Sequence, residues 1–222
     1  ATPVVSHPVL WGRVRQNTME GRKVIVIDPR RSETAMNADY WYGLKWRSDL
    51  LLLYTVANEL IERDWVDHGF IEAHTEQFEE FRRFVKSYTL ERGAAGTGLS
   101  REEILELVRL IHEGKRVSFW WTMGVNQGYE AVRTAQAIIN LALMTGNIGK
   151  PGTGANSITG QCNAMGSRAF SNTAVFYGGG DFADPARRAR IAQVLGVDES
   201  MLAEKPTKTY NQIIEGIHAG EI

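Results

Sequence analysis

Two carboxylates, Asp28 and Asp49, are the side chains whose positions most clearly suggest binding chemistry. Asp28 ends an apolar run at 24–27, and a carboxylate at the carboxyl end of such a strand can accept both hydroxyls of a ribose. Asp49 opens a Leu-rich helical pattern, and a carboxylate can accept the N1–H and the exocyclic amino group of guanine together, a pair that adenine lacks. Both residues also have ordinary explanations: a strand-end Asp-Pro turn, and an acid in the first turn of a helix.

Residues that could contact phosphate or sugar oxygens surround both carboxylates. Directly after Asp28 these are Pro29, Arg30, Arg31 and Ser32. The proline restricts the exit from the strand, while guanidinium and hydroxyl groups donate hydrogen bonds to anionic oxygens. Arg47 and Ser48 precede Asp49, where they could contact the same nucleotide, and Ser48 could alternatively cap the helix.

A second candidate contact lies in the loop that follows the apolar run 117–121. Gly124 and Gly128 permit close approach of the backbone to a ligand. Asn126 and Gln127 offer amide donors and acceptors to a flat heterocycle. A plain turn between strand and helix is the alternative, but two amides between two glycines favour a binding loop.

The first residues form a third candidate, because a loop that runs into a helix can hold a phosphate on its backbone N–H groups. Thr2, Ser6 and the N–H groups of Val4 and Val5 are suitable donors. The same pattern fits an ordinary helix start, which we favour from these residues alone.

Residues 145–168 form a fourth candidate, within a long loop at 145–180 that is rich in Gly, Asn and Ser. A long loop of this composition inside an α/β domain is usually functional. Ile158, Met165 and Phe170 are interspersed in it, which favours an ordered segment over a disordered linker.

The elements that must position these residues alternate between strands and helices. We predict strands at 23–28 and 117–121, a polar connection at 30–40, a loop at 93–98, a turn at 124–128, and helices at 7–16, 48–64, 67–73, 76–86, 100–113, 131–144, from 184 onwards and at 210–218. This alternation predicts an α/β fold with a doubly wound, mostly parallel sheet and helices on both faces. We expect one domain at 1–144 and a loop-rich, helical segment at 145–222, with both ends cut from a longer polypeptide.

Composition and charge exclude several classes of function. The 222 residues are 43% hydrophobic and 23% charged with a net charge of −1, which is typical of a globular protein and gives no indication of a nucleic-acid or membrane surface. No apolar run reaches the roughly 18 residues that a membrane helix needs. Cys162 is the single cysteine and the five histidines lack metal-ligand spacing, so we expect no metal site.

The ordered series of motifs resembles the molybdopterin oxidoreductases that carry two guanine dinucleotides on molybdenum. The resemblance covers nearly the whole chain and rests on residues 24–31, 48–49, 123–127 and 143–154. It implies a Rossmann-like cofactor-binding domain for bis-molybdopterin guanine dinucleotide (bis-MGD). Residues 159–173 and 178–182 are similar to the cytoplasmic assimilatory nitrate reductases in particular.

The resemblance also implies a role for each candidate. Asp28 to Ser32 would hold the guanosine ribose and phosphate, and Arg47 to Asp49 the guanine. The remaining implied contacts are the pterin with Met123 and Gln127, a pyrophosphate with the segment from Thr2 to Val5, and the cofactor with Gln161 and Asn163. Thr2 stands where the family often has Asn, and Arg47 where it has a smaller or amide residue.

The resemblance further implies that the intact enzyme reduces nitrate to nitrite, with electrons from a ferredoxin, a flavodoxin or an NADH-linked subunit. The family's Cys motif for a [4Fe–4S] cluster and its molybdenum ligand are absent from this sequence, so we expect both in other segments of the polypeptide and expect this chain to be inactive alone. We expect a cytoplasmic location, with the periplasm as the alternative. The competing functions are another member of the family, such as a formate dehydrogenase, and a NAD-dependent dehydrogenase, although the Gly-x-Gly-x-x-Gly pattern of the latter is missing.

Overall fold

The structure is a computed structural model that describes residues 2–18, 21–169, 180–205 and 208–222. The chain divides into two compact units, Ala1–Gly160 and Gln161–Ile222. The first unit contains all the described strands and the main hydrophobic core, whereas the described part of the second consists of helices and connecting segments.

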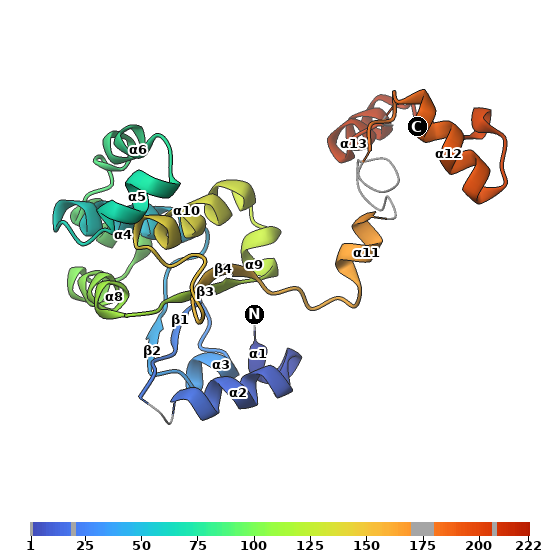
Figure 1. The fold of residues 1–222 in the computed structure, drawn as a ribbon. Helices are drawn as coiled ribbons and strands as arrows, with labels where there is room; N and C mark the ends of the chain where they lie inside the picture. The colour runs from blue at the N-terminus through green and yellow to red at the C-terminus, as the bar shows by residue number, and fades with distance from the viewer. Residues whose placement is uncertain (1, 19–20, 170–179, 206–207) are drawn as a thin grey trace. The chain divides into compact units, whose positions relative to one another are not determined.

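Two pairs of parallel strands lie in the first unit (Figure 1). β1 (Ile25–Ile27) pairs with β2 (Tyr40–Tyr42), and β3 (Ser118–Trp121) pairs with β4 (Gly154–Ser157). The fold is therefore mixed α/β with parallel pairing, as expected. Instead of one doubly wound sheet, however, the described strands form two separate sheets of two strands each.

Sequence patterns identified only the first strand of each pair. β1 and β3 coincide with the apolar runs at 24–27 and 117–121. β2 is only three residues long and begins at Tyr40, the last residue of the segment that we predicted to be a polar connection. β4 reads Gly-Ala-Asn-Ser, which contains no strong strand former, so its conformation depends on pairing with β3.

The predicted helices are present with small shifts at their ends. They are α2 (Pro8–Thr18), α4 (Asp49–Glu62), α5 (His68–His74), α6 (Phe78–Val85), α8 (Arg101–Glu113), α10 (Ala131–Met144), α12 (Pro185–Leu195) and α13 (Tyr210–Ala219). The predicted capping box of α8 is confirmed, because Ser100 and Glu103 each accept a hydrogen bond from the other's backbone N–H.

Short helices also occur where no helix was predicted. They are α1 (Pro3–Ser6), α3 (Glu33–Met36), α9 (Met123–Asn126), α11 (Ala164–Ala169) and the 3-10 turn η2 (Glu199–Met201). The predicted long loop at 145–180 thus contains β4 and α11, while its residues 170–179 lie outside the described part.

The prediction of a loop at 93–98 is wrong, because these residues end helix α7 (Leu90–Thr97). A Cβ added to Gly93 would lie 2.5 Å from Cγ2 of Thr55, and one added to Gly96 would collide with Leu51. Both glycines therefore let α7 approach α4 closely and do not mark a turn. Only Gly98, at φ 78°, ends the helix in the left-handed conformation.

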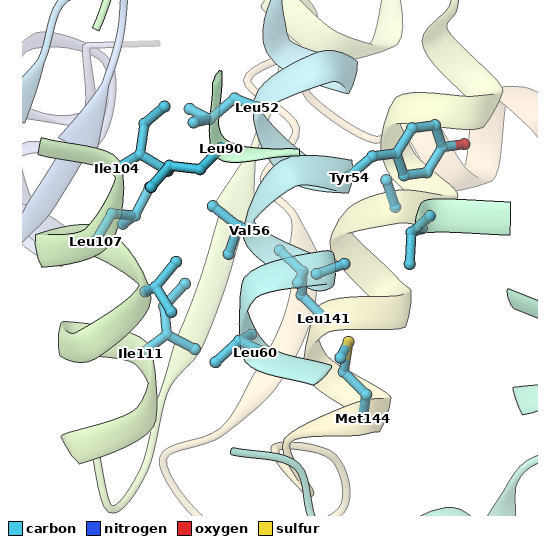
Figure 2. Close-up of a cluster of buried hydrophobic side chains, with 14 of the residues drawn as sticks. Leu52, Tyr54, Val56, Leu60, Leu90, Ile104, Leu107, Ile111, Leu141 and Met144 are labelled. Atoms are coloured by element: carbon cyan, nitrogen blue, oxygen red, sulfur yellow. The ribbon is translucent and has the colours of Figure 1, made fainter. Parts of the chain in front are cut away.

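Helix α4 is the centre of the hydrophobic core. Figure 2 shows Leu52, Val56 and Leu60 of α4 with side chains of α8 and of α10 on either side. These three leucine and valine residues are at most 1% exposed, and burial of each such side chain stabilises a fold by about 1.5–3 kcal/mol. The core therefore fixes α4, and with it the position of Asp49 at its first turn.

The described residues of the second unit form α11, α12, η2 and α13 with their connecting segments. Asp184 caps α12 by accepting the N–H of Arg187 at 3.2 Å, and Thr209 forms a capping box with Gln212 in α13. Arg188 lies 3.6 Å from Glu199 and thereby joins α12 to η2. No helix in the described ranges is long and apolar enough to cross a membrane.

Candidate nucleotide-binding site

The carboxyl ends of β1 and β2 form the edge that carries Asp28. Because the two strands are parallel, with Ile27 opposite Tyr42, both chains leave the sheet at the same edge. The N–H of Asp28 donates to the carbonyl of Tyr42 at 3.2 Å, which extends the pairing by one residue. After Tyr42, residues 43–48 lead directly into α4.

Asp28 is half-buried and is held by short-range contacts. Its Oδ1 accepts the N–H of Arg30 at 2.8 Å, and its carbonyl accepts the indole N–H of Trp41 at 2.9 Å. The guanidinium of Arg31 lies 5.5 Å from the centre of the Trp41 ring. The exit from β1 therefore has a defined conformation, with Pro29, Arg30 and Arg31 exposed to solvent.

Asp49, the first residue of α4, shares this edge with Asp28. Burial raises the pKa of the Asp49 carboxyl above its ordinary value, and the negative charge of Asp28 raises it further. Among the described residues the structure records no ion pair that would neutralise either carboxylate. The edge thus presents two neighbouring acceptors that favour a ligand with hydrogen-bond donors.

The Lys45–Ser48 turn joins β2 to α4, and Ser48 stabilises it. The Ser48 hydroxyl donates to the carbonyl of Lys45 at 2.6 Å, and the Ser48 N–H donates to the same carbonyl at 3.3 Å. Ser48 is 6% exposed and makes no side-chain capping bond, so the expected cap of α4 is absent. Its side chain maintains the turn, whereas Arg47 is exposed with a left-handed φ of 63°.

Ser32 is also committed to local structure. It is 2% exposed and caps α3 by accepting the N–H of Ala35 at 3.4 Å. Thr34, which the sequence analysis did not select, is 4% exposed and lies within 3.5 Å of the backbone nitrogen of Val4. It links the segment after β1 to the N-terminal residues.

The N-terminal candidates form the short helix α1. The N–H groups of Val5 and Ser6 donate to the carbonyl of Thr2 at 2.9 and 3.0 Å, so both are occupied within the helix. His7 was not among the candidates, but its Nε2 lies 3.4 Å from the carbonyl of Thr159, beyond the end of β4.

The carboxyl ends of β3 and β4 carry the third group of candidates. Asn126 accepts the indole N–H of Trp121 at 2.9 Å and donates to the Ser157 hydroxyl at 3.1 Å, so its amide joins the ends of the two strands. Met123 is half-buried, while Gly124 has open space where a Cβ would be and Gln127 is exposed. Ser157 was missed because nothing in its sequence context marks the end of a strand.

The structure thus brings together most of the candidate segments. The N-terminal segment contacts the residues after β1 through Thr34 and those after β4 through His7. Gln161 and Asn163 belong to the second unit, where the carbonyl of Asn163 accepts the N–H of Ser167 at 2.9 Å. Within the described ranges, no three His, Cys, Asp or Glu side chains are grouped as metal ligands would be.

Comparison with known proteins identifies the family. The profile of the family described as Molybdopterin oxidoreductase matches residues 1–222. Formate dehydrogenase H of Escherichia coli is 38% identical over 197 residues, which cover 88% of this chain and 28% of that protein. Assimilatory nitrate reductase of Haloferax mediterranei is 35% identical over 204 residues, which cover 92% of this chain and 28% of that protein.

A solved structure agrees with the sequence comparisons. Acetylene hydratase from Pelobacter acetylenicus matches with a TM-score of 0.62 and 25% identity, over 64% of this chain and 20% of that one. The chain therefore spans about a quarter of the length of its relatives. With the family profile matched along its entire length, this chain belongs to the molybdopterin oxidoreductase family.

Proposed function

We propose that the edge formed by β1, β2 and the start of α4 binds the guanosine end of a molybdopterin guanine dinucleotide. The observation that carries the proposal is the pair Asp28 and Asp49, two half-buried carboxylates close enough to influence each other and with no cation recorded beside them in the described chain. Guanine offers two donors on one edge, and a ribose offers two hydroxyls.

The donor set of this cofactor fits the residues present. Asp49 would accept from N1–H and N2–H of the base, which compensates for the unfavourable burial of its charge. Asp28 retains Oδ2 for ribose hydroxyls, since only Oδ1 accepts the N–H of Arg30. The exposed Arg30 and Arg31 suit the phosphates, whereas Ser32 would act by shaping the loop.

The pterin end would lie along the carboxyl edge of β3 and β4. There Met123, Gly124 and Gln127 are the candidate contacts, and Asn126 would position them through its bonds to Trp121 and Ser157. Thr2, Val4 and Val5 would border the pyrophosphate, and Gln161 and Asn163, which belong to the second unit, are further candidates for cofactor contact. When bound with molybdenum, the cofactor supplies the redox chemistry, while these residues bind and orient it.

We further propose that residues 1–144 form the main part of a larger Rossmann-like domain, with 145–222 leading into an adjoining one. In the intact enzyme, additional strands would complete a doubly wound sheet from the two pairs seen here. The relatives span about four times the length of this chain, which supports further segments for a [4Fe–4S] cluster and the molybdenum ligand. The chain alone would then have no turnover.

For the reaction, we propose reduction of nitrate in the cytoplasm, supported by the nitrate reductases among the relatives. Ferredoxin, flavodoxin or an NADH-linked subunit would donate the electrons. Oxidation of formate is the second candidate, because several relatives are formate dehydrogenases. The intact enzyme should oxidise reduced viologen with nitrate and should not reduce oxidised viologen with formate. The opposite result would assign the second reaction.

Calorimetric titration tests the nucleotide site itself. The chain should bind GDP more tightly than ADP or NAD, and Asp49→Asn should weaken GDP binding by roughly 10- to 150-fold, because hydrogen bonds to charged groups contribute about 1.5–3 kcal/mol. Glu102→Gln is the matched control, since Glu102 is an exposed acid in the first turn of α8. Equal affinity for GDP and ADP, or no change in Asp49→Asn, would contradict the proposal.

A further inference from the structure

The Lys45–Ser48 turn carries unusual residues at its two central positions. The N–H of Ser48 donates to the carbonyl of Lys45 at 3.3 Å, and Arg47 has a φ of 63°. A hydrogen-bonded turn whose third residue is left-handed corresponds to type II, which favours proline at its second position and glycine at its third. This chain has Trp46 and Arg47 there.

Neither central side chain is explained by the packing of the protein. Trp46 is 84% exposed, so its large apolar ring remains in water. Arg47 adopts a conformation that is unfavourable for any residue with a Cβ. In the described portion of the chain, the structure records no hydrogen bond, ion pair or ring contact for either side chain.

The opposite side of the turn is firmly attached to the fold. The N–H of Lys45 donates to the carbonyl of Thr97 at 2.7 Å, and its Nζ donates to the carbonyl of Ala95 at 3.2 Å, so Lys45 anchors the turn to the end of α7. The Ser48 hydroxyl closes the turn from within. Trp46 and Arg47 are therefore held at the apex of a well-supported turn, immediately before Asp49.

We propose that Trp46 stacks on the face of the purine ring whose edge Asp49 recognises. This inference rests on the proposed nucleotide site. The hydrogen bonds that Asp49 would accept engage only the edge of the base and leave both of its faces free. An exposed indole held just before Asp49 in the chain supplies the flat apolar surface that stacks on such a face.

Trp46 and Asp49 would contribute differently to nucleotide binding, so their effects can be measured separately. Stacking does not depend on which purine is bound, whereas the Asp49 hydrogen bonds do. Trp46→Ala should therefore weaken binding of GDP and of ADP to the full chain by similar factors, roughly 5- to 150-fold for GDP. The preference for GDP over ADP should remain. Trp46→Phe should retain most of the affinity, because the phenyl ring still stacks.

The matched control is Tyr210→Ala, which removes a 77% exposed aromatic ring far along the chain from the site residues. GDP affinity should not change in this variant. Because Trp46 is exposed, its replacement should leave the thermal unfolding temperature unchanged. Tryptophan fluorescence gives a second measurement: GDP should quench the wild type more than Trp46→Phe, and the difference reports Trp46 directly.

The outcomes separate the two proposals. If GDP binds, Asp49→Asn weakens it and Trp46→Ala matches Tyr210→Ala, the stacking inference is wrong while the nucleotide site stands. Equal quenching in the wild type and in Trp46→Phe would reject it independently. If the wild type does not prefer GDP over ADP and Asp49→Asn has no effect, the nucleotide site itself is rejected, and the role of Trp46 with it.

Discussion

Replacement of Tyr42 by Phe tests how the edge that carries Asp28 is held in place. Tyr42 ends β2, is 2% exposed, and donates its hydroxyl to Glu106 of α8 at 3.0 Å. Its carbonyl accepts the N–H of Asp28. Burial raises the pKa of the Tyr42 phenol far above its ordinary value, and the hydrogen bond to Glu106 raises it further, so the phenol remains a donor at neutral pH.

The size of the effect follows from that single bond. A hydrogen bond to a charged group contributes about 1.5–3 kcal/mol, so Tyr42→Phe should lower the free energy of unfolding by this amount at pH 7. Because the folded-state pKa is raised, this stability is fully present below the unfolded pKa of about 10 and is lost as the pH rises above it. Between pH 10 and 11 the difference between wild type and variant should shrink by about 1 kcal/mol.

Urea unfolding followed by circular dichroism at pH 7, 9, 10 and 11 measures this difference. Tyr40→Phe is the control, because Tyr40 is half-buried in the same strand and the described residues provide no recorded hydrogen bond for its hydroxyl. It should change stability by less than about 0.5 kcal/mol. A Tyr42→Phe variant as stable as this control, or a difference that stays constant from pH 7 to 11, would refute the reasoning.

Three further predictions concern the stability of the fold. Thr55→Val should raise the melting temperature by about 2–4 °C, because the fully buried Thr55 hydroxyl finds no hydrogen-bond partner among the described residues. A variant that melts below the wild type would show that this hydroxyl does form a stabilising hydrogen bond. Gly93→Ala should lower the free energy of unfolding, measured in urea, by about 1–3 kcal/mol, because the added methyl group would clash with Thr55. Gly12→Ala should raise it, because the space beside Gly12 in α2 is open. A change of the same sign in both variants would contradict the close packing of α4 and α7. Asp49→Asn should be more stable than the wild type at pH 7, because the raised pKa of Asp49 means that the folded state disfavours its ionised form. The difference in stability should disappear as the pH falls towards 4, where the carboxyl becomes protonated. A difference that persists at pH 4 would contradict this explanation.

Helices with strong local signals were predicted well from the sequence. α10 was predicted at its observed bounds, and α8 was recognised from its capping box and the glycine that follows it. Such signals act within a few residues of the chain, so they do not depend on the rest of the fold. The class of the fold and the parallel direction of the strands also followed from local patterns in order along the chain.

Residues whose role depends on distant partners could not be interpreted in this way. Gly93 suggested a loop but lies against Thr55 of another helix. Asn126 was selected as a candidate ligand contact, and only the structure shows that its amide joins the ends of β3 and β4. Strand β4 has no strand-forming side chains and exists through its pairing with β3.

The candidate site shows the same division. By itself, the order of residue types along the chain indicated the family and selected Asp28 and Asp49 as candidate site residues, because a carboxylate after a strand or at a helix start is a local feature. Tertiary structure alone decided that the two acids share one edge and raise the pKa of Asp49, that Ser32 and Ser48 turn inward, and that Trp46 remains exposed. The physical reason is that burial, charge coupling and hydrogen-bond partners depend on which segments are in contact. The packing of α4 against α7, α8 and α10 determines these contacts.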